Sequence, residues 1–376
     1  MTFITGVKYL APEAHQAFVA DRLLALKEKL RAEIHGVSDE RSLRLATWNL
    51  MHFGDGGAYQ RTAESLLYIA EIIDHFDLVA IQEVNHDLKQ FEYLMDAHLG
   101  QAWDYIVTDT TAGAKGNSER LAFAYRKSKV RFRKEAGEIV LPTGQEIADP
   151  GTDEAGRNVQ FARTPFSVAF QAGWFKFKLC TVHIFYGKSS DSSPHMERRR
   201  REIEKIAQFL AQRQQDEEKM LGERSEQDRQ EANYILLGDF NIVSPEHQTM
   251  QALERAGFVI PQAIKDAPSS LSGTHHYDQI AFKLADSRFE LGASGIFDMF
   301  GAVYREGDAG HYVDVVKPEE FDEDSDGDPR DRAQKERYYK TYYRKHQMSD
   351  HKLLWCEIKT DYSDNYLQQI RDRAIV

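Results

Sequence analysis

Eight short runs rich in β-branched and aromatic residues constrain the fold of this chain more than any other feature. They lie between residues 43 and 358 and read LRLATWNL, DLVAIQEV, RLAFAYR, TPFSVAF, FKFKLCTVHIF, NYILLGDFNI, YDQIAFKL and HKLLWCEI. Several alternate between apolar and polar residues and several are continuously apolar, as strands are when one or both faces of a sheet are buried. Since helical stretches separate the runs, the series predicts a layered α/β fold.

Residues 1–40 are predicted to form an N-terminal helical extension before the first strand. Between Pro12 and Gly36, apolar residues recur on one helical face, with charged residues opposite. The apolar residues are Val19, Leu23, Leu26 and Leu30. This face either packs on the main domain or binds a protein partner or a second copy of the chain; about two heptads are too few to predict a coiled coil.

The main domain is predicted to span residues 41–362, with two insertions, and a C-terminal tail follows at 363–376. Residues 213–231 carry many charges of both signs and few large apolar groups, so an exposed helical extension or loop is expected there. Residues 306–347 begin acidic, through PEEFDEDSDGD, and become basic and aromatic, through RYYKTYYRKH. We expect both insertions to lie outside the core.

The composition is that of a globular protein, with 41% hydrophobic and 11% aromatic residues. The chain has 48 basic and 60 acidic side chains and a formal net charge of −12. This charge argues against a protein that coats nucleic acid by electrostatics alone. It does not exclude a nuclease whose cations lie in one cleft or come from a bound metal.

Cys180 and Cys356 are the only cysteines of the sequence, and two cysteines cannot build a disulfide framework. The N-terminal residues MTFITGVKYLAPEAHQ lack a basic stretch followed by a long apolar run. No segment approaches about 18 uncharged apolar residues, the length that a membrane span needs. We therefore expect a soluble cytoplasmic protein that does not engage a membrane.

Unusual polar residues occur at the ends of the predicted strands. They are Asn49, Glu83, His183, Asp239, Asn241, Asp278, Asp350 and His351. Loops at strand ends of layered α/β proteins converge on one crevice, so these side chains are expected to meet there. Carboxylates suit a hard divalent cation such as Mg²⁺ bound with substrate phosphate, and histidines suit proton transfer near neutral pH. The combination indicates phosphodiester cleavage.

Each of these residues alone has a commoner explanation. A glutamate after an apolar strand, such as Glu83, usually forms a cap or a rim salt bridge, and a lone histidine such as His183 is more often a satisfied core or turn residue. The GDFN segment alone is compatible with a tight turn. The ordered series, and no single member, favours a catalytic site.

Nine segments, in this order, resemble the endonuclease/exonuclease/phosphatase superfamily, and within it most closely the branch of pancreatic deoxyribonuclease I. They are ATWNL, AIQEV, NSERLAFAYRKSKV, ARTPFSV, TVHIF, LLGDFNI, YDQIAF, GIFDMFGAVY and SDHKLLW, and they cover about residues 44–360. The resemblance implies a four-layered α/β sandwich in which two packed, mixed β-sheets are flanked by helices. The N-terminal helix, the long stretch between GAVY and SDH and the lack of the deoxyribonuclease disulfides depart from the pattern.

The resemblance also implies a metal site and a first catalytic pair. Glu83 would be the principal Mg²⁺ ligand, with Asn49 beside it and Asp350 in the inner or outer shell of the metal. Mn²⁺ is an alternative to Mg²⁺. His351 would be a catalytic histidine, oriented by Asp278.

A second catalytic pair is implied in the same way. His183 would be the second catalytic histidine or a phosphate donor, with Glu119 as its acidic partner, and this match favours a nuclease over lipid and inositol phosphatases. Asp239 and Asn241 would position the attacking water and the scissile phosphate, with Asp239 as the favoured base. Arg163 would contact the substrate phosphate.

Two basic segments are candidates for holding substrate. In MERRRREIEKI, Arg198 and its neighbours either bind phosphates near the cleft or form a solvated helix face paired with glutamates. The run from Tyr338 to Lys345 either stacks on bases and binds phosphates or packs amphipathically on the domain surface.

The residues Asp322, Asp324, Asp326 and Gly327 match the first half of a calcium-binding loop. The twelfth position is Ala333, where such a loop needs a bidentate glutamate, and no flanking helix pair is evident. An ordinary acidic loop is therefore favoured over a structural Ca²⁺ site.

The sequence thus predicts a Mg²⁺-dependent phosphodiesterase that hydrolyses nucleic acid, with DNA as the favoured substrate and endonucleolytic cleavage as the favoured mode. One alternative is a phosphomonoesterase or lipid phosphodiesterase that uses the same groups. Another is a catalytically silent binding module that keeps the fold, although no expected ligand is missing from the sequence. The choices between DNA and RNA, and between single and double strands, stay open.

Overall fold

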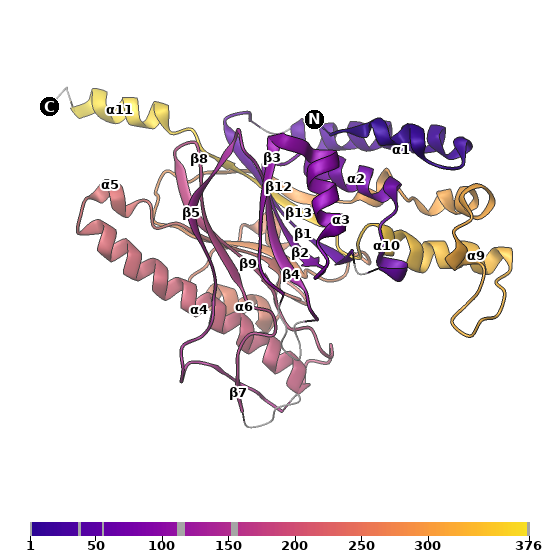
Figure 1. Cartoon of the computed structure of the whole chain (residues 1–376). Helices are drawn as coiled ribbons and strands as arrows, with labels where there is room; N and C mark the ends of the chain where they lie inside the picture. The colour runs from indigo at the N-terminus through magenta and orange to yellow at the C-terminus, as the bar shows by residue number, and fades with distance from the viewer. Residues whose placement is uncertain (1, 37–38, 55, 111–116, 152–156, 374–376) are drawn as a thin grey trace.

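The computed structural model describes residues 2–36, 39–54, 56–110, 117–151 and 157–373, and at its centre two β-sheets pack face to face (Figure 1). The first sheet has the strand order β12 (Leu291–Phe297), β13 (Leu353–Lys359), β1 (Ser42–Phe53), β2 (Leu78–Val84), β4 (Arg120–Arg126) and β3 (Trp103–Val107). The second has the order β11 (Asp278–Lys283), β10 (Tyr234–Asp239), β9 (Phe175–His183), β8 (Phe166–Ala172) and β5 (Val130–Glu138). A short hairpin pairs β6 (Ile147–Ala148) with β7 (Asn158–Val159).

Each large sheet contains one parallel pair. β1 runs parallel to β2, and β9 runs parallel to β10. The other strand pairs of the two sheets are antiparallel. Both sheets are therefore mixed, as the sequence predicted.

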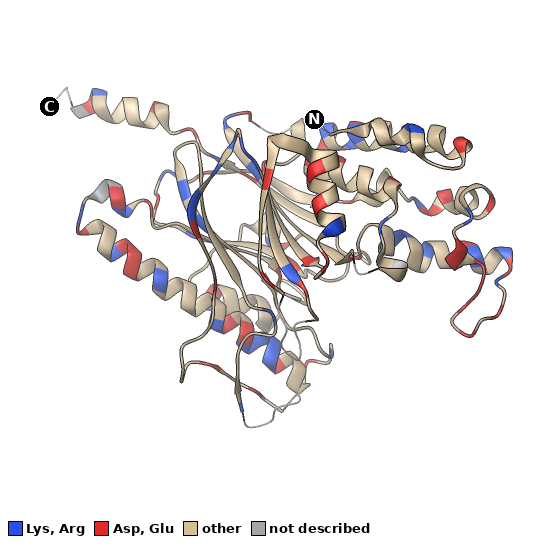
Figure 2. Ribbon diagram, in the orientation of Figure 1, with Lys and Arg blue, Asp and Glu red and all other residues tan. Residues whose placement is uncertain are grey.

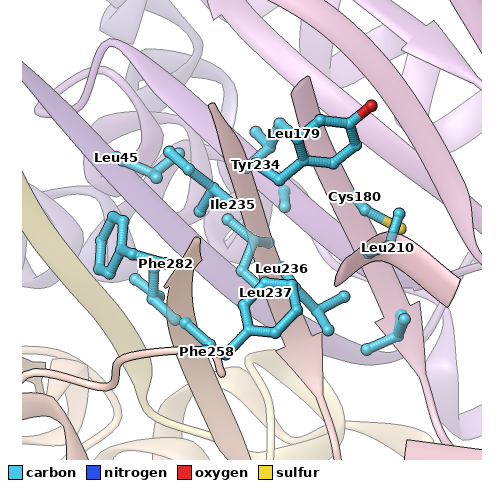
Figure 3. Packing of buried hydrophobic residues seen from close by; sticks show 14 of the residues in the cluster. Leu45, Leu179, Cys180, Leu210, Tyr234, Ile235, Leu236, Leu237, Phe258 and Phe282 are labelled. Atoms are coloured by element: carbon cyan, nitrogen blue, oxygen red, sulfur yellow. The ribbon is translucent and has the colours of Figure 1, made fainter. Parts of the chain in front are cut away.

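Alternating side chains of the strands build two cores. On β1, Leu43 and Leu45 point into the core between the sheets, whereas Ala46 and Trp48 belong to a second core under the helices. This alternation follows from the two-residue period of a strand. Figure 3 shows Leu45 beside Ile235 of β10 in the inter-sheet core.

Helices cover the outer faces of both sheets, which gives the four layers predicted (Figure 1). α1 (Glu13–Leu30) and α2 (Ala63–Ile73) cover the first sheet. α4 (Pro194–Gly222) and α6 (Gln248–Arg255) cover the second sheet. The other α-helices are α3 (Lys89–Tyr93), α5 (Glu226–Arg229), α7 (Gln262–Lys265), α8 (Ala309–His311), α9 (Arg332–Tyr338), α10 (Arg344–Gln347) and α11 (Ser363–Arg373), and short 3-10 and π-helical turns connect several elements.

The apolar face of α1 packs against other parts of the same chain. All four residues of its predicted stripe are buried in the second core, so this face packs on the main domain. A hydrogen bond of 3.0 Å joins Nε2 of His15 to a carboxylate oxygen of Glu64 on α2. The structure thus favours the packing alternative over the partner or dimer helix.

The two insertions behave differently from each other. Residues 213–231 continue α4 to Gly222 and add α5, and charges of both signs lie along α4 (Figure 2). The prediction that residues 306–347 lie outside the core is wrong for several of their aromatic residues. Tyr312, Tyr339 and Tyr343 are buried in the second core, because the helical spacing of Tyr339 and Tyr343 places both on the inward stripe.

The described helices include none that is both long and apolar enough to cross a membrane. Cys180 and Cys356 are free and buried, and Figure 3 shows Cys180 packed beside Leu210 of α4. Burial raises the pKa of both thiols, so neither is suited to act as a nucleophile.

Candidate active site

The strand ends that carry the predicted site meet at one edge of the two sheets. Because β1 and β2 are parallel, Asn49 and Glu83 near their carboxyl ends lie at the same edge. β9 and β10 bring His183 and Asp239 together as register partners. β11 runs antiparallel to β10 and begins with Asp278, the other register partner of Asp239.

The backbone of this edge has conformations that few residues adopt. Glu83 has φ of 60° and Asn241 has φ of 54°, in the left-handed region that is uncommon for residues other than glycine. Gly238, directly before Asp239, has φ of 130°, and an added Cβ would lie 2.2 Å from the carbonyl oxygen of Val182. Only glycine therefore allows β10 to approach β9 this closely at the residue that precedes Asp239.

His351, in the loop before β13, forms a buried pair with Asp278. Its Nδ1 lies 2.8 Å from Oδ2 of Asp278, whose backbone N–H donates to Oγ of Ser269. Burial alone would lower the pKa of His351, but the carboxylates of Asp278 and Asp239 outweigh it and raise that pKa well above 6.5. His351 is therefore an imidazolium at neutral pH, with Nε2 free of the Asp278 bond.

His183 forms the corresponding pair with Glu119, which directly precedes β4. Nδ1 of His183 lies 2.8 Å from Oε2 of Glu119, and Arg163 binds the same carboxylate through Nε and Nη2 at 3.0 and 3.1 Å. Burial opposes ionisation of Glu119, but the positive charges of His183 and Arg163 hold its pKa well below the usual range. Arg163 thus contacts the site through Glu119.

The carboxylate of Asp239 lies between the two histidines. Its Oδ2 is 3.6 Å from Nε2 of His183 and 3.7 Å from Nε2 of His351. Its Oδ1 accepts the backbone N–H of Asn241 at 2.9 Å. Burial would raise the pKa of Asp239, but both histidines and the Asn241 N–H lower it, so this side chain is a carboxylate at neutral pH.

Asn49 forms hydrogen bonds to two carboxylates of the site. Its Oδ1 accepts the backbone N–H of Met51 at 2.8 Å, which directs Nδ2 toward Glu83 at 2.7 Å and Asp239 at 3.0 Å. Asn49 therefore orients two carboxylates of the site, and its place beside the metal stays a prediction. It is completely buried, which fixes this orientation.

Three groups of acidic and histidine side chains in the described chain have donor atoms within 4.8 Å of one another, close enough to hold a metal ion. They are Glu83 with His183 and Asp239, His52 with Glu83 and Glu119, and Asp239 with Asp278 and His351. The carboxylates of Glu83 and Asp239 fit a hard divalent cation. Asp350 belongs to none of these groups, although its charge contributes to the raised pKa of His351.

Asn241 lies at the site, whereas the side chain of Arg198 is buried in other contacts. The Nδ2 of Asn241 donates to the carbonyl oxygen of Ile184 at 2.8 Å and so ties the end of β10 to the end of β9. Arg198 is buried on α4, where its Nε lies 3.2 Å from Glu202 and its guanidinium stacks on Phe185. The prediction that Arg198 binds substrate is not supported, because a run of arginines in sequence does not indicate which face of a helix each one occupies.

The acidic loop lacks a calcium-binding arrangement. Oδ1 of Asp324 accepts the backbone N–H groups of Asp326 and Asp328, and Asp322 pairs with Lys335. None of the metal-compatible groups in the described residues includes these aspartates. The loop is an ordinary acidic turn in this structure.

Three residues at the site were missed by the sequence analysis. Nδ1 of His52 lies 3.6 Å from Glu83, and the ring of Tyr277 lies 5.3 Å from that of His351. Arg61 is buried and donates to the carbonyl oxygens of Leu50 and Met51, and burial lowers its pKa to about 9. His52 and Tyr277 each lie within three residues of a predicted site residue, and this closeness in sequence could have identified them. Arg61 lies in a loop that contains no predicted site residue.

Comparisons with known proteins find a family that matches most of the chain. The model of the Endonuclease/Exonuclease/phosphatase family matches residues 46–351. Similar solved structures include D. rerio TDP2 complexed with single-strand DNA product (13% identity, 85% of this chain and 99% of that chain, TM-score 0.48). They also include the human Nocturnin catalytic domain with bound sulfate (14% identity, 86% of this chain and 96% of that chain, TM-score 0.47). A third is an endonuclease/exonuclease/phosphatase from Bacteroides vulgatus (16% identity, 85% of this chain and 99% of that chain, TM-score 0.47). No curated protein matches the sequence.

Proposed function

The chain belongs to the endonuclease/exonuclease/phosphatase family, whose members are hydrolases of phosphoester bonds, and from this premise we propose that it is a Mg²⁺-dependent phosphodiesterase that makes internal cuts in DNA. One observation carries the proposal. The carboxylate of Asp239 lies 3.6 and 3.7 Å from the Nε2 atoms of two histidines, and each histidine is held by a second carboxylate through Nδ1. This arrangement places one carboxylate beside two histidines, whose pKa values burial would lower but the neighbouring carboxylates raise.

Each of these groups has a separate role in the proposed hydrolysis. Asp239, kept ionised by its neighbours, takes a proton from the attacking water. The imidazolium groups of His183 and His351 donate through Nε2 to the phosphate oxygens, where negative charge grows in the transition state. One of them passes its proton to the departing oxygen, so no covalent intermediate is needed.

Glu83 would be the principal Mg²⁺ ligand, with Asn49 beside it, Asp350 in the inner or outer shell and Mn²⁺ as an alternative ion, whereas Asp239 is kept as the base. A bound divalent cation would neutralise phosphate charge and lower the pKa of bound water. Asn49 holds the carboxylate of Glu83 ready for this role.

The proposal is tested with the purified protein on single- and double-stranded DNA and RNA, in Mg²⁺, Mn²⁺, Ca²⁺ or chelator. We expect nicking of supercoiled plasmid in Mg²⁺ or Mn²⁺ and none with chelator. Release of inorganic phosphate or of a lipid head group, with intact DNA and RNA, would instead assign the chain to the phosphomonoesterases or lipid phosphodiesterases. Inactivity on every phosphoester would indicate a silent binding module.

A further inference from the structure

A line of aromatic rings leads from Glu83 out along the insertion at residues 306–347. The rings are those of His52, Tyr59, His346, Tyr342 and Tyr338, and we call them the aromatic track. Successive ring centroids are 4.8, 4.8, 6.1 and 5.7 Å apart. The track begins at the candidate metal site, because the backbone N–H of His52 donates to Oε2 of Glu83 at 2.9 Å.

The outer half of the track is one stripe of a helical segment. Tyr338, Tyr342 and His346 are four residues apart and so share a face. The neighbouring stripe, with Tyr339 and Tyr343, is buried in the core and anchors the segment. Tyr342 is 47% exposed and the side chain of His52 is 37% exposed, so rings in both the inner and the outer half of the track are accessible.

Cations accompany the outer rings. Nζ of Lys345 lies 5.0 Å from the ring centroid of Tyr342, and the guanidinium of Arg330 lies 4.2 Å from that of Tyr338. Aromatic faces with neighbouring cations bind bases by stacking and the phosphates between them by charge. The ligand chemistry that fits is therefore a chain of planar rings joined by anionic groups.

The bases of such a ligand must be unpaired. In a duplex the base faces are stacked on each other and the phosphates are dense, at one charge per about 1.7 Å of helix axis. Exposed carboxylates of the loop Asp322–Asp328 lie next to α9, as the red segments of Figure 2 show, and they disfavour a densely charged ligand. Stacking depends less on charge, so it suits a protein with a net charge of −12.

We infer that the aromatic track is a binding site for a single-stranded stretch of nucleic acid next to the scissile phosphate. The inference rests on the proposed function, and it adds a substrate form that the catalytic groups alone do not specify. The bound strand stacks its bases on the track, while its sugar–phosphate backbone continues to the site at Glu83 and Asp239.

The test measures binding by fluorescence anisotropy in chelator, where no cleavage occurs. Four labelled probes are compared: a short single-stranded deoxythymidine oligonucleotide, a random-sequence single strand, the duplex of that sequence, and an oligomer of abasic spacers with the same phosphates. We expect both single strands to bind at least about fivefold more tightly than the duplex or the abasic oligomer, since stacking contributes about 1–3 kcal/mol per base. Equal binding of the base-containing and abasic strands, or tighter binding of the duplex, would overturn the inference.

A matched set of variants locates the site. Tyr342→Ala should weaken single-strand binding about fivefold or more, and Tyr342→Phe should restore it, because the phenyl ring keeps the stacking face. Tyr366→Ala on α11 is the control, since Tyr366 is 45% exposed but lies outside the track. If Tyr342→Ala and Tyr366→Ala bind alike, the inference is wrong.

A third measurement separates this inference from the proposed function. Tyr342→Ala should lower the rate on a single-stranded oligonucleotide at least about fivefold more than the rate on bis(4-nitrophenyl) phosphate, because this small diester lacks the bases that stack on Tyr342. If the wild type does not hydrolyse the diester or DNA, the proposed function fails, and the binding comparison still decides whether the track takes single strands.

Discussion

Asp278 and His351 lie 73 residues apart in the chain, and Oδ2 of Asp278 is 2.8 Å from Nδ1 of His351. The two residues begin or precede strands of different sheets, so this bond also joins the two halves of the sandwich at the site. It fixes the ring so that Nε2 points toward Asp239, and it supports the positive charge of the ring. The catalytic geometry therefore depends on a contact between the sheets.

Replacing Asp278 with asparagine should reduce catalysis much more than substrate binding. The variant Asp278→Asn keeps the shape of the side chain but removes the charge that raises the pKa of His351. We expect kcat to fall roughly 10²-fold or more with KM little changed, as for loss of an acid–base group. The measurement is the initial rate on a labelled oligonucleotide as a function of pH. Asp298→Asn, which removes the exposed partner of Lys352, is the control and should keep kcat within twofold.

Removing Glu119 should destabilise the fold by leaving Arg163 unpaired. Both side chains are buried, and the bidentate contact neutralises each of them. We expect Glu119→Ala to lower the free energy of unfolding by about 3–5 kcal/mol, measured by urea denaturation. The double variant Glu119→Ala/Arg163→Ala should lose less than the sum of the single variants. Additive losses would show that the two residues are not coupled.

Gly238→Ala should be strongly destabilising, because its Cβ would lie 2.2 Å from the carbonyl oxygen of Val182 and φ is 130°. We expect the free energy of unfolding to fall by about 4 kcal/mol or more. Gly137→Ala in β5 is the matched control, since no atom lies within 4 Å of its added Cβ and the cost there should stay within about 0.5 kcal/mol. Thermal unfolding of both variants, followed by circular dichroism, compares them directly. Similar melting temperatures would contradict the claim that position 238 requires glycine.

His98 should contribute a loss of stability as the pH falls through about 6.5. Burial lowers the pKa of His98 below 6.5, although its Nδ1 contacts the carbonyl oxygen of Phe3, and its Nε2 is buried without a hydrogen-bond partner. The unfolded chain therefore binds this proton at higher pH than the folded chain, so the stabilising contribution is present above pH 6.5 and is lost below it. Urea denaturation between pH 7.5 and 5 should show a smaller pH dependence for His98→Gln. The exposed His86→Gln should retain the full dependence, and equal slopes for both variants would contradict this account.

The strand-end residues illustrate what the sequence allows one to predict. His183, Asp239 and Asp278 each end or begin an apolar run, and the parallel or antiparallel pairing of neighbouring strands then brings them to one edge. The burial of α1 also followed from its apolar stripe. These features depend on local periodicity, which the sequence displays directly.

Other features depend on tertiary contacts that no local pattern records. Arg198 lies in a basic run but is buried against Glu202 and Phe185. The orientation of Asn49 depends on the backbone of Met51, and the burial of Tyr339 depends on packing of the insertion against the second core. The pairing of Glu119 with His183 was expected only from the family resemblance, because 64 residues separate them.

The most direct test of the account is the plasmid-nicking rate of Asp239→Asn in Mg²⁺. This substitution removes the proposed base while preserving the shape of the side chain, and unfolding by urea establishes that the variant is folded. Asp286→Asn, a similarly buried aspartate paired with Arg288 away from the site, is the control. We expect Asp239→Asn to nick DNA roughly 10²- to 10⁴-fold more slowly and Asp286→Asn to nick it at the wild-type rate. Nicking by folded Asp239→Asn within twofold of the wild-type rate would contradict the central claim.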